Sequence, residues 1–251
     1  MNRCMSIAIH LGLFALLSSF NAPAAVSLSG TRLIFDGRFH EASLGVVNRG
    51  NHEVLIQAWL SEPDNVEGNP DTAGDLPFVL TPHLMRLDRS AKQVIRVLYQ
   101  GQGMAQDVES LLHLYVLEIP RRADSANQLS IAIRQRINLF YRPAGLTEDP
   151  AKTALRLRWT LASGNAGLSV LRVSNPTPYH AALQDVRLDG VPASEYLLLA
   201  PGASHELPVA AVVDTRRLSF EALNDYGGVL AYCAHGNRDG FNNTESRQKD
   251  C

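Results

Sequence analysis

The sequence predicts an all-β fold made of two β-sandwich domains joined by a short hinge. Three observations predict it: apolar and polar residues alternate along many short segments, turn-forming residues separate these segments, and helical periodicity is scarce. The composition is that of a globular protein with a buried core, since 45% of the 251 residues are hydrophobic and 19% are charged.

The alternation is clearest at Leu155–Leu161, where every second residue is apolar (Leu155, Leu157, Trp159 and Leu161). Successive side chains of a strand point to opposite faces, so this pattern predicts a strand that is buried on one face. Similar strands are expected at 31–35, 42–47, 54–60, 93–99, 110–119, 128–141, 168–173, 180–186, 195–199 and 229–232. Turn-forming residues lie between them, as in Asn48–Asn51 and Asn224–Gly228.

A domain boundary is expected at Pro143, which closes a long strand. The following segment, Ala144–Lys152, contains Gly, Pro, Thr, Asp and Glu and few apolar residues. The boundary separates residues 25–143 from residues 144–251, and each part has the usual size of an immunoglobulin-like sandwich. The second part ends in a polar tail, Asn242–Cys251.

Residues 1–24 have the pattern of a secretory signal peptide. Arg3 precedes the apolar run Ile7–Leu17, and Ala22-Pro23-Ala24 supplies small residues for cleavage. The run is shorter than the ~20 apolar residues that a transmembrane helix needs, and no later run reaches that length. The sequence therefore predicts an exported protein with no integral membrane segment.

Charge and motifs argue against several functions. With Lys+Arg 23 against Asp+Glu 25, the net charge of −2 does not favour nucleic acid as a partner. Gly101-Gln102-Gly103 lacks the third glycine of a dinucleotide loop, and neither GxSxG nor a Walker A loop occurs. The histidines form no HxH or HxxxH pair. We expect no enzymatic activity, no cofactor and no metal site.

Cys233 and Cys251 remain once Cys4 has left with the signal segment. A disulfide between them would pin the polar tail, whereas two free thiols are the alternative. The sequence does not show that the two sulfurs meet, so both alternatives stay open.

The segment Gln128–Leu139 and the cation Arg32 each allow two interpretations. The segment is either a core strand with a basic end or an edge strand that offers Leu129, Ile131 and Ile133 to a partner sheet. Arg32, which lies among strand residues, is either a surface group or an anion site, because a guanidinium can bind a carboxylate through two hydrogen bonds.

A family resemblance favours the second interpretation in both cases. It rests on the order and spacing of short motifs: Thr31-Arg32, Phe35-Asp36-Gly37, Gln57-Ala58-Trp59, Thr81-Pro82, Arg86-Leu87, Glu109-Ser110-Leu111, Glu118-Ile119-Pro120, Leu139-Phe140-Tyr141-Arg142-Pro143-Ala144, Asn175-Pro176-Thr177-Pro178-Tyr179 and Asn224-Asp225-Tyr226-Gly227-Gly228. Through these motifs the chain resembles the PapD-like periplasmic chaperones of the chaperone–usher pilus pathway, over nearly its full length.

The resemblance implies two immunoglobulin-like domains in a boomerang arrangement and a chaperone of the periplasm. Its partners would be pilus or fimbrial subunits and an outer-membrane usher. A subunit lacks its last strand, and the chaperone would lend Gln128–Leu139, with Leu129, Ile131 and Ile133 filling the subunit's groove. Arg32 would anchor the subunit's C-terminal carboxylate.

The resemblance also implies an interdomain ion network made of Glu109, Arg142 and Asp225. One departure from the family concerns Asn138, which stands where a lysine usually helps the arginine to bind the carboxylate. Alternation puts Arg136 and Arg134 on the same face as Asn138, so we hypothesise that Arg136 compensates. The loop Arg121–Asn127 is short, which is typical of the short-loop branch of the family.

Two other function classes are alternatives to a chaperone. The first is a secreted adhesin or pilus structural subunit with two immunoglobulin-like domains. Such a chain would normally carry its own N-terminal donor extension and an aromatic C-terminal end. The second is a periplasmic hydrolase, for which the sequence offers no catalytic triad. An exposed apolar edge also raises the prospect of self-association of the free protein.

Overall fold

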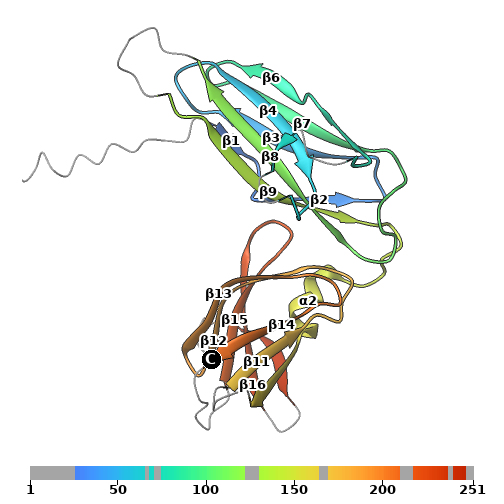
Figure 1. The fold of residues 1–251 in the computed structure, drawn as a ribbon, viewed down its shortest axis with the longest axis vertical. Helices are drawn as coiled ribbons and strands as arrows, with labels where there is room; N and C mark the ends of the chain where they lie inside the picture. The colour runs from blue at the N-terminus through green and yellow to red at the C-terminus, as the bar shows by residue number, and fades with distance from the viewer. Residues whose placement is uncertain are drawn as a thin grey trace, which may run out of the picture.

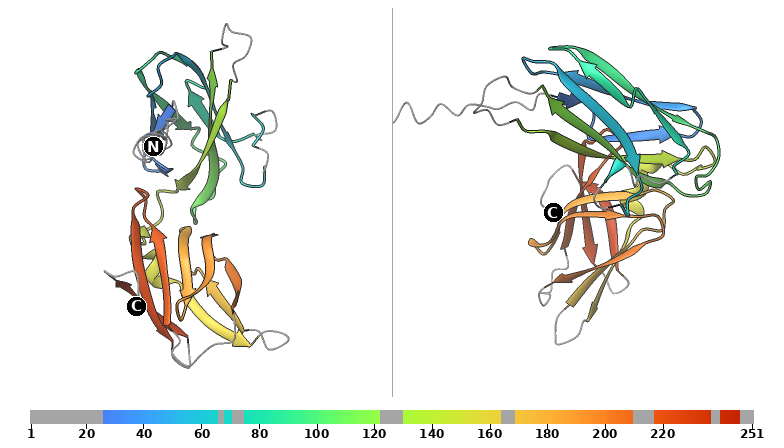
Figure 2. Two further views of the ribbon diagram at one scale, coloured as in Figure 1. Left: turned by 90° about the vertical axis from the view of Figure 1, so that its left-hand side faces the viewer. Right: turned by 45° about the horizontal axis from the view of Figure 1, so that its top comes forward.

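The computed structural model of the chain describes residues 26–65, 68–70, 75–121, 130–163, 169–209, 217–236 and 240–246. Two β-sandwiches lie at an angle to each other and meet at their facing ends (Figures 1 and 2). The prediction of two all-β, immunoglobulin-like domains in a bent arrangement is therefore confirmed. The predicted signal peptide, residues 1–24, lies outside the described residues.

The N-terminal domain packs two antiparallel sheets face to face, with one parallel pair at an edge. The described strands of the first sheet are, in spatial order, β1 (Val26–Leu28), β3 (Glu41–Asn48), β7 (Lys92–Tyr99) and β5 (Phe78–Thr81). Those of the second are β2 (Arg32–Asp36), β9 (Ile133–Arg142), β8 (Ser110–Pro120), β4 (Val54–Ser61) and β6 (Leu84–Leu87). Phe35, Leu44, Ile95, Leu114 and Leu139 are fully buried between them. Alternation along each strand supplies this core.

The C-terminal domain repeats this plan with a core of its own. The described strands of one sheet are β10 (Arg158–Ser163), β11 (Ser169–Ser174) and β14 (Ser204–Val209). Those of the other are, in spatial order, β13 (Val191–Leu199), β12 (Ala181–Leu188), β15 (Arg217–Leu223), β16 (Val229–Gly236) and β17 (Phe241–Ser246). Trp159, Leu171, Leu183, Leu218 and Phe220 are buried between the two sheets.

The hinge contains a short helix where the sequence predicted a strand. A 3₁₀ turn, η2 (Pro150–Lys152), leads into α2 (Thr153–Arg156), and β10 begins only at Arg158. The prediction of a strand over Leu155–Leu161 is therefore wrong in its first half. The cause is local: the Asp149 side chain accepts the N–H of Ala151 at 3.0 Å and Pro150 opens the turn, which favours a helical start.

The predicted polar tail also contains a strand. Phe241–Ser246 forms β17, which pairs with β16 from Ala231↔Ser246 to Gly236↔Phe241. Backbone pairing to the edge of β16 does not need apolar side chains, so hydrophobic alternation could not reveal it. Cys233 of β16 is disulfide-bonded. Cys251, its partner in one of the two alternatives above, lies outside the described residues.

Candidate functional site

Strand β9 has a neighbour along its whole length on one side only. It pairs with β8 over Ile133–Tyr141, and it pairs in parallel with β2 only over Asn138–Arg142. Opposite Ile133–Ile137, the edge that faces away from β8 has no strand partner in the described part of the chain. Half of this strand is therefore open to pairing with another chain.

The start of β9 differs from the predicted strand Gln128–Leu139. The strand begins at Ile133, and residues 130–132 are described without strand pairing. The ladder with β8 stops at Glu118↔Ile133, and Pro120 has no N–H with which to extend it. Ile131 and Ile133 are 62% and 37% exposed. Leu129, the third predicted donor residue, and residues 122–127 of the predicted short loop lie outside the described residues.

The two faces of β9 differ in character. Ile137, Leu139 and Tyr141 are buried in the core of the N-terminal domain. The alternate residues, among them Arg134, Arg136 and Asn138, follow one another on the outer face, as the alternation predicts. Asn138 is the register partner of Arg32 on β2 and of His113 on β8, so these three residues form a row across the sheet.

Arg32 opens β2 at the point where the free edge of β9 ends. Its guanidinium lies 5.8 Å from the centre of the Phe140 ring and donates one long hydrogen bond, of 3.5 Å, to the carbonyl of Leu223 in the C-terminal domain. Its Nε is buried without a hydrogen-bond partner. Burial lowers the pKa of Arg32, and the charges of Tyr196 and Asp225 partly offset this effect. An arginine nevertheless stays protonated in proteins, so Arg32 is a charged donor with bonding capacity left.

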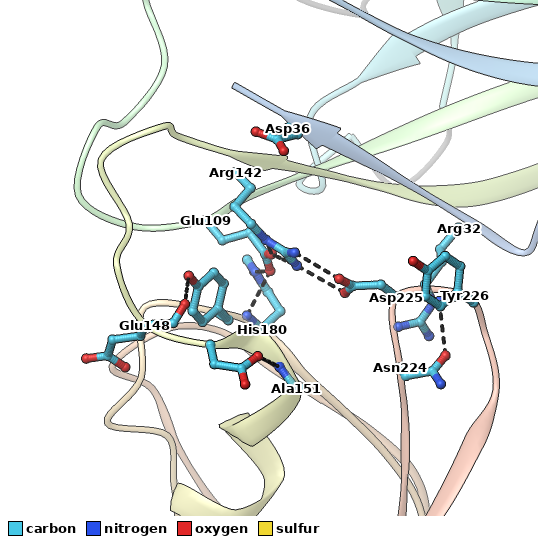
Figure 3. Close-up of polar contacts among 12 residues, drawn as sticks. Arg32, Asp36, Glu109, Arg142, Glu148, Ala151, His180, Asn224, Asp225 and Tyr226 are labelled. Carbon is cyan, nitrogen blue, oxygen red and sulfur yellow. Dashed lines mark hydrogen bonds and ion pairs between the residues drawn. The ribbon is translucent and has the colours of Figure 1, made fainter. Parts of the chain in front are cut away.

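Arg32 lines a cavity of about 330 Å³ that lies at the junction of the two domains. Residues of both domains line it, including Phe140 from the N-terminal domain and Tyr226 and Leu230 from the C-terminal domain. Figure 3 shows Arg32 beside the turn that carries Asn224 and Tyr226. A ligand group in this cavity would therefore contact the two domains at once.

The structure brings Glu109, Arg142 and Asp225 together (Figure 3). The Arg142 guanidinium donates to Glu109 Oε2 at 2.7 and 3.0 Å and, across the domain boundary, to Asp225 at 2.9 and 3.1 Å. Burial alone would lower the pKa of Arg142, but the hydrogen bond to Asp225 and the charge of Glu109 outweigh it, so the pKa is raised. The arginine is thus a charged link between the domains.

His180 completes this network, and sequence reasoning missed it. Its N–H donates to Glu109 Oε1 at 2.9 Å, and its Nδ1 lies 3.0 Å from the same oxygen. The N–H of Glu109 donates to the carbonyl of Pro178 at 2.8 Å. Only the position of His180 directly after the motif Asn175–Tyr179 could have indicated its role, because it carries no histidine-pair signature.

The positive charge of Arg136 affects the pKa of His113, which lies in the same row as Asn138. Burial lowers the pKa of His113, the cross-strand partner of Asn138, and the charge of Arg136 lowers it further. No hydrogen bond or ion pair of Arg136 is found among the described residues. A shared role of Arg136 and Asn138 in binding a carboxylate stays a prediction.

No group of three or more His, Cys, Asp or Glu residues in the described ranges is arranged to hold a metal ion. Among the same residues, no helix is long and apolar enough to cross a membrane. What the site offers is a free strand edge, a charged donor at the end of that edge, and a fixed junction between two domains.

In a comparison with known proteins, two family models match the chain. A model of the N-terminal domain of PapD, described as a pili and flagellar-assembly chaperone, matches residues 25–147, and a model of the C-terminal domain of the pili assembly chaperone PapD matches residues 152–234. The chain belongs to the PapD-like family of pilus assembly chaperones. This is a chaperone family and not an enzyme family.

Relatives of this PapD-like chain agree over most of their length. It is 33% identical to the probable fimbrial chaperone YadV of Escherichia coli K12, over 84% of this chain and 90% of YadV. It is 36% identical to the probable fimbrial chaperone LpfB of Escherichia coli O157:H7, over 90% of this chain and 95% of LpfB. Both domains match chaperones, which decides against the alternative of an adhesin or a pilus structural subunit.

Solved structures lead to the same conclusion. The crystal structure of the YadV chaperone matches with a TM-score of 0.67 at 27% identity, over 89% of this chain and 100% of that one. The structure of the Salmonella enterica SafA pilin in complex with the SafB chaperone matches with a TM-score of 0.70 at 26% identity, over 83% of this chain and 94% of that one. The PapD-like fold therefore extends over both domains of the chain.

Proposed function

We propose that this chaperone captures pilus subunits in the periplasm by lending them the free edge of β9, and that it delivers them to an outer-membrane usher. The observation that carries the proposal is the one-sided pairing of β9, which ends where β2 begins at Arg32. Family membership and the pilin complex formed by the related SafB support it. The work would draw on binding energy alone, with no cofactor and no catalytic step.

The geometry of the edge sets the direction of the captured strand. β9 runs from its open half at Ile133 toward the half that β2 covers, beginning at Asn138. A strand added along the open half cannot continue past β2, so one of its ends stops beside Arg32. If that end is the C-terminus, the strand runs parallel to β9 and its carboxylate meets the guanidinium. Main-chain hydrogen bonds would then complete the subunit's sheet.

Apolar side chains would supply most of the attraction. Ile131 and Ile133 are exposed in the free chaperone, and Leu129 would extend the same series. Burying each of them in the subunit's groove contributes about 1.5–3 kcal/mol before the costs of association. The free protein exposes the same groups, so we also propose that it can self-associate through this edge.

The carboxylate anchor would combine Arg32 with Asn138 and Arg136. The Nε of Arg32 has no hydrogen-bond partner and can donate to a carboxylate oxygen. Such a charge-assisted hydrogen bond is about twice as strong as a neutral one. Asn138, the register partner of Arg32, can donate only from a neutral amide. Arg136, whose charge already affects the next residue of this row, would supply the missing second cation.

The ion network would hold the two halves of the site at a fixed angle. Glu109 and Arg142 belong to the N-terminal domain and His180 and Asp225 to the C-terminal domain, and the bonds between them cross the junction. Because Arg32 also reaches across the junction to Leu223, a change of domain angle would displace the anchor itself.

Periplasmic co-expression with a pilus subunit tests the proposal. We expect the wild-type chaperone to yield a soluble one-to-one complex and Ile131→Asp to abolish it, because a carboxylate cannot enter an apolar groove without a large desolvation penalty. Val191→Asp is the matched control, since Val191 is similarly exposed, at 54%, on the C-terminal domain. A complex that forms equally well with Ile131→Asp and with Arg32→Ala would overturn the proposal.

A further inference from the structure

A stack of side chains covers the outer face of the sheet beside the open half of β9. Trp59 of β4 and Tyr115 of β8 are register partners, and their rings stack with centroids 5.3 Å apart and planes 9° from parallel. The guanidinium of Arg134, on β9, lies 5.3 Å from the centre of the Tyr115 ring. The stack therefore connects β4, β8 and β9 from outside the core.

Gly68, in the loop after β4, contacts all three side chains of this stack. The carbonyl of Gly68 accepts hydrogen bonds from Trp59 Nε1 at 3.0 Å and from Arg134 at 3.5 Å. Gly68 has a φ of +56°, and a Cβ at this position would lie 2.2–2.6 Å from the Tyr115 ring and hydroxyl. Only glycine permits both this backbone conformation and this close approach.

The position of Tyr115 in this stack is unfavourable for its hydroxyl group. It is 2% exposed, and its hydroxyl is buried without a hydrogen-bond partner. The ring is therefore held for its flat apolar surface, on which Arg134 and Trp59 lie, rather than for its hydroxyl.

We propose that Trp59, Tyr115, Arg134 and Gly68 form a clamp that keeps the first half of β9 extended before a subunit arrives. This inference rests on the proposed function, because it assigns the clamp the task of preparing the donor edge. Arg134 and Tyr115 are positioning residues: they act on the backbone of β9 through the stack and need not touch the subunit.

The need for such a clamp follows from the one-sided pairing. Among the described residues, β8 is the only strand that pairs with Ile133–Ile137, whereas an interior strand is paired on both sides. On the other side, the side chain of Gln135 donates one hydrogen bond to the carbonyl of Val26 at 3.0 Å. If this half frayed in the free protein, each capture would have to order it again, and ordering a residue opposes binding. Arg134 lies one residue after Ile133, at the end of the ladder with β8, where fraying would begin.

The central experiment compares Arg134→Gln with Arg89→Gln. Both remove one positive charge from an exposed residue of the N-terminal domain, but no hydrogen bond, ion pair or ring contact of Arg89 is found in the described part of the chain. The probe is a synthetic peptide with the sequence of a pilus subunit's C-terminal strand and a free carboxylate. For Arg134→Gln we expect about tenfold weaker peptide binding, equivalent to restoring disorder to about one residue. Amide exchange at residues 133–137 of the free protein should also become faster, with no change in the thermal midpoint.

A second pair of variants separates the clamp from general backbone strain. Gly68→Ala introduces the clash with Tyr115, whereas Gly101→Ala, at a φ of +88° with nothing within 4 Å, introduces backbone strain without a clash. We expect only Gly68→Ala to accelerate exchange at residues 133–137. Tyr115→Phe keeps the stack and removes the unpartnered hydroxyl, so it should bind the peptide like the wild type, whereas Tyr115→Leu should not.

The two readouts keep this inference and the proposed function apart. Exchange in the free protein does not depend on capture, so faster exchange in Arg134→Gln with no peptide binding by any variant would support the clamp and overturn strand lending. Wild-type exchange in both Arg134→Gln and Gly68→Ala, with the peptide bound normally, would overturn the clamp and leave the proposed function in place.

Discussion

The two domains have similar folds but differ in the strands at the edges of their sheets. In the N-terminal domain the first half of β9 is paired on one side, and Ile131 and Ile133 are exposed there. In the C-terminal domain the edge strand β17 is polar, and the opposite edge strand β13 carries Pro192 near its start. Polar side chains and proline are the usual means by which soluble proteins protect an edge. The open half of β9, Ile133–Ile137, contains no proline and is flanked by the exposed Ile131, and this difference from β13 and β17 is why we assign the function to it.

The largest expected effect comes from breaking the ion network at the junction of the two domains. Arg142→Ala leaves Glu109, whose side chain is 2% exposed, with a buried charge and without its guanidinium partner. Removing one member of a buried pair lowers the free energy of unfolding by about 3–5 kcal/mol. Trp59 and Trp159, the two tryptophans of the sequence, report one domain each in urea unfolding followed by fluorescence of single-tryptophan variants.

We expect the Arg142→Ala transition to move to lower urea at Trp59 more than at Trp159. Arg172→Ala is the control, because Arg172 and Glu206 form an ion pair with side chains 56% and 55% exposed. Exposed pairs contribute less than about 1 kcal/mol. Equal, small shifts in both variants would show that the network does not stabilise the junction.

The next effect concerns the anchor at the end of the open edge. Arg32→Ala should weaken binding of the subunit's C-terminal peptide by about 1.5–3 kcal/mol, the usual contribution of a hydrogen bond to a charged group. The same peptide with a C-terminal amide should bind weakly to the wild type and equally weakly to Arg32→Ala, when both are measured by titration calorimetry. If Arg32→Ala lowers the affinity for the amide as much as for the free acid, the guanidinium does not bind the carboxylate.

Much of the fold could be predicted from the sequence, because alternation reports burial directly. Segments such as 54–60 and 93–99 became β4 and β7 with small changes at their ends. Alternation failed at Leu155, which lies in α2, because Asp149 and Pro150 favour a helical start that period-two reasoning does not consider. It also failed at β17, where a polar segment is held by backbone pairing to β16 and by side-chain hydrogen bonds of Asn243 and Thr244.

The candidate site was predictable where it depended on motifs and unpredictable where it depended on tertiary contacts. The motifs that contain Glu109, Arg142 and Asp225 indicated three residues that the fold brings within bonding distance. Nothing in the sequence indicated that His180 would share Glu109, or that Gly68 would lie on Tyr115 across 46 intervening positions. Such contacts depend on which strands become neighbours and on where a loop crosses them.

A smaller effect is expected at the protected edge of the C-terminal domain. The side-chain amide of Asn243 on β17 donates to the carbonyls of Ala154, Leu155 and Leu157, at and after the end of α2. Asn243→Ala leaves these carbonyls to water and should lower the free energy of unfolding by about 1–2 kcal/mol, since each net hydrogen bond contributes about 1 kcal/mol or less here. The loss should appear in the Trp159 transition. Asn242→Ala, one residue earlier on the same strand, should change it much less.

The smallest effect is a pH dependence beside the open edge. Glu118, the register partner of Ile133, is 4% exposed and accepts the N–H of Val26 at 3.1 Å. Burial raises the pKa of the Glu118 carboxyl, and the hydrogen bond from Val26 only partly opposes this effect. The folded state therefore holds this proton to a higher pH than the unfolded state does. As the pH rises above the ordinary carboxyl pKa of 4.5, Glu118 lowers the free energy of unfolding.

Glu118→Gln keeps an oxygen that can accept the N–H of Val26 and removes the titration. We expect the variant to be slightly more stable than the wild type at pH 7, by less than about 1 kcal/mol, and equal to it below pH 4.5, where both carry an uncharged side chain. Urea unfolding at both pH values, followed at Trp59, measures the difference. Glu195→Gln, on the exposed edge of β13, serves as the control for losing one charge. If the higher stability of Glu118→Gln persists unchanged at low pH, the difference in the free energy of unfolding comes from packing and not from the buried charge of Glu118.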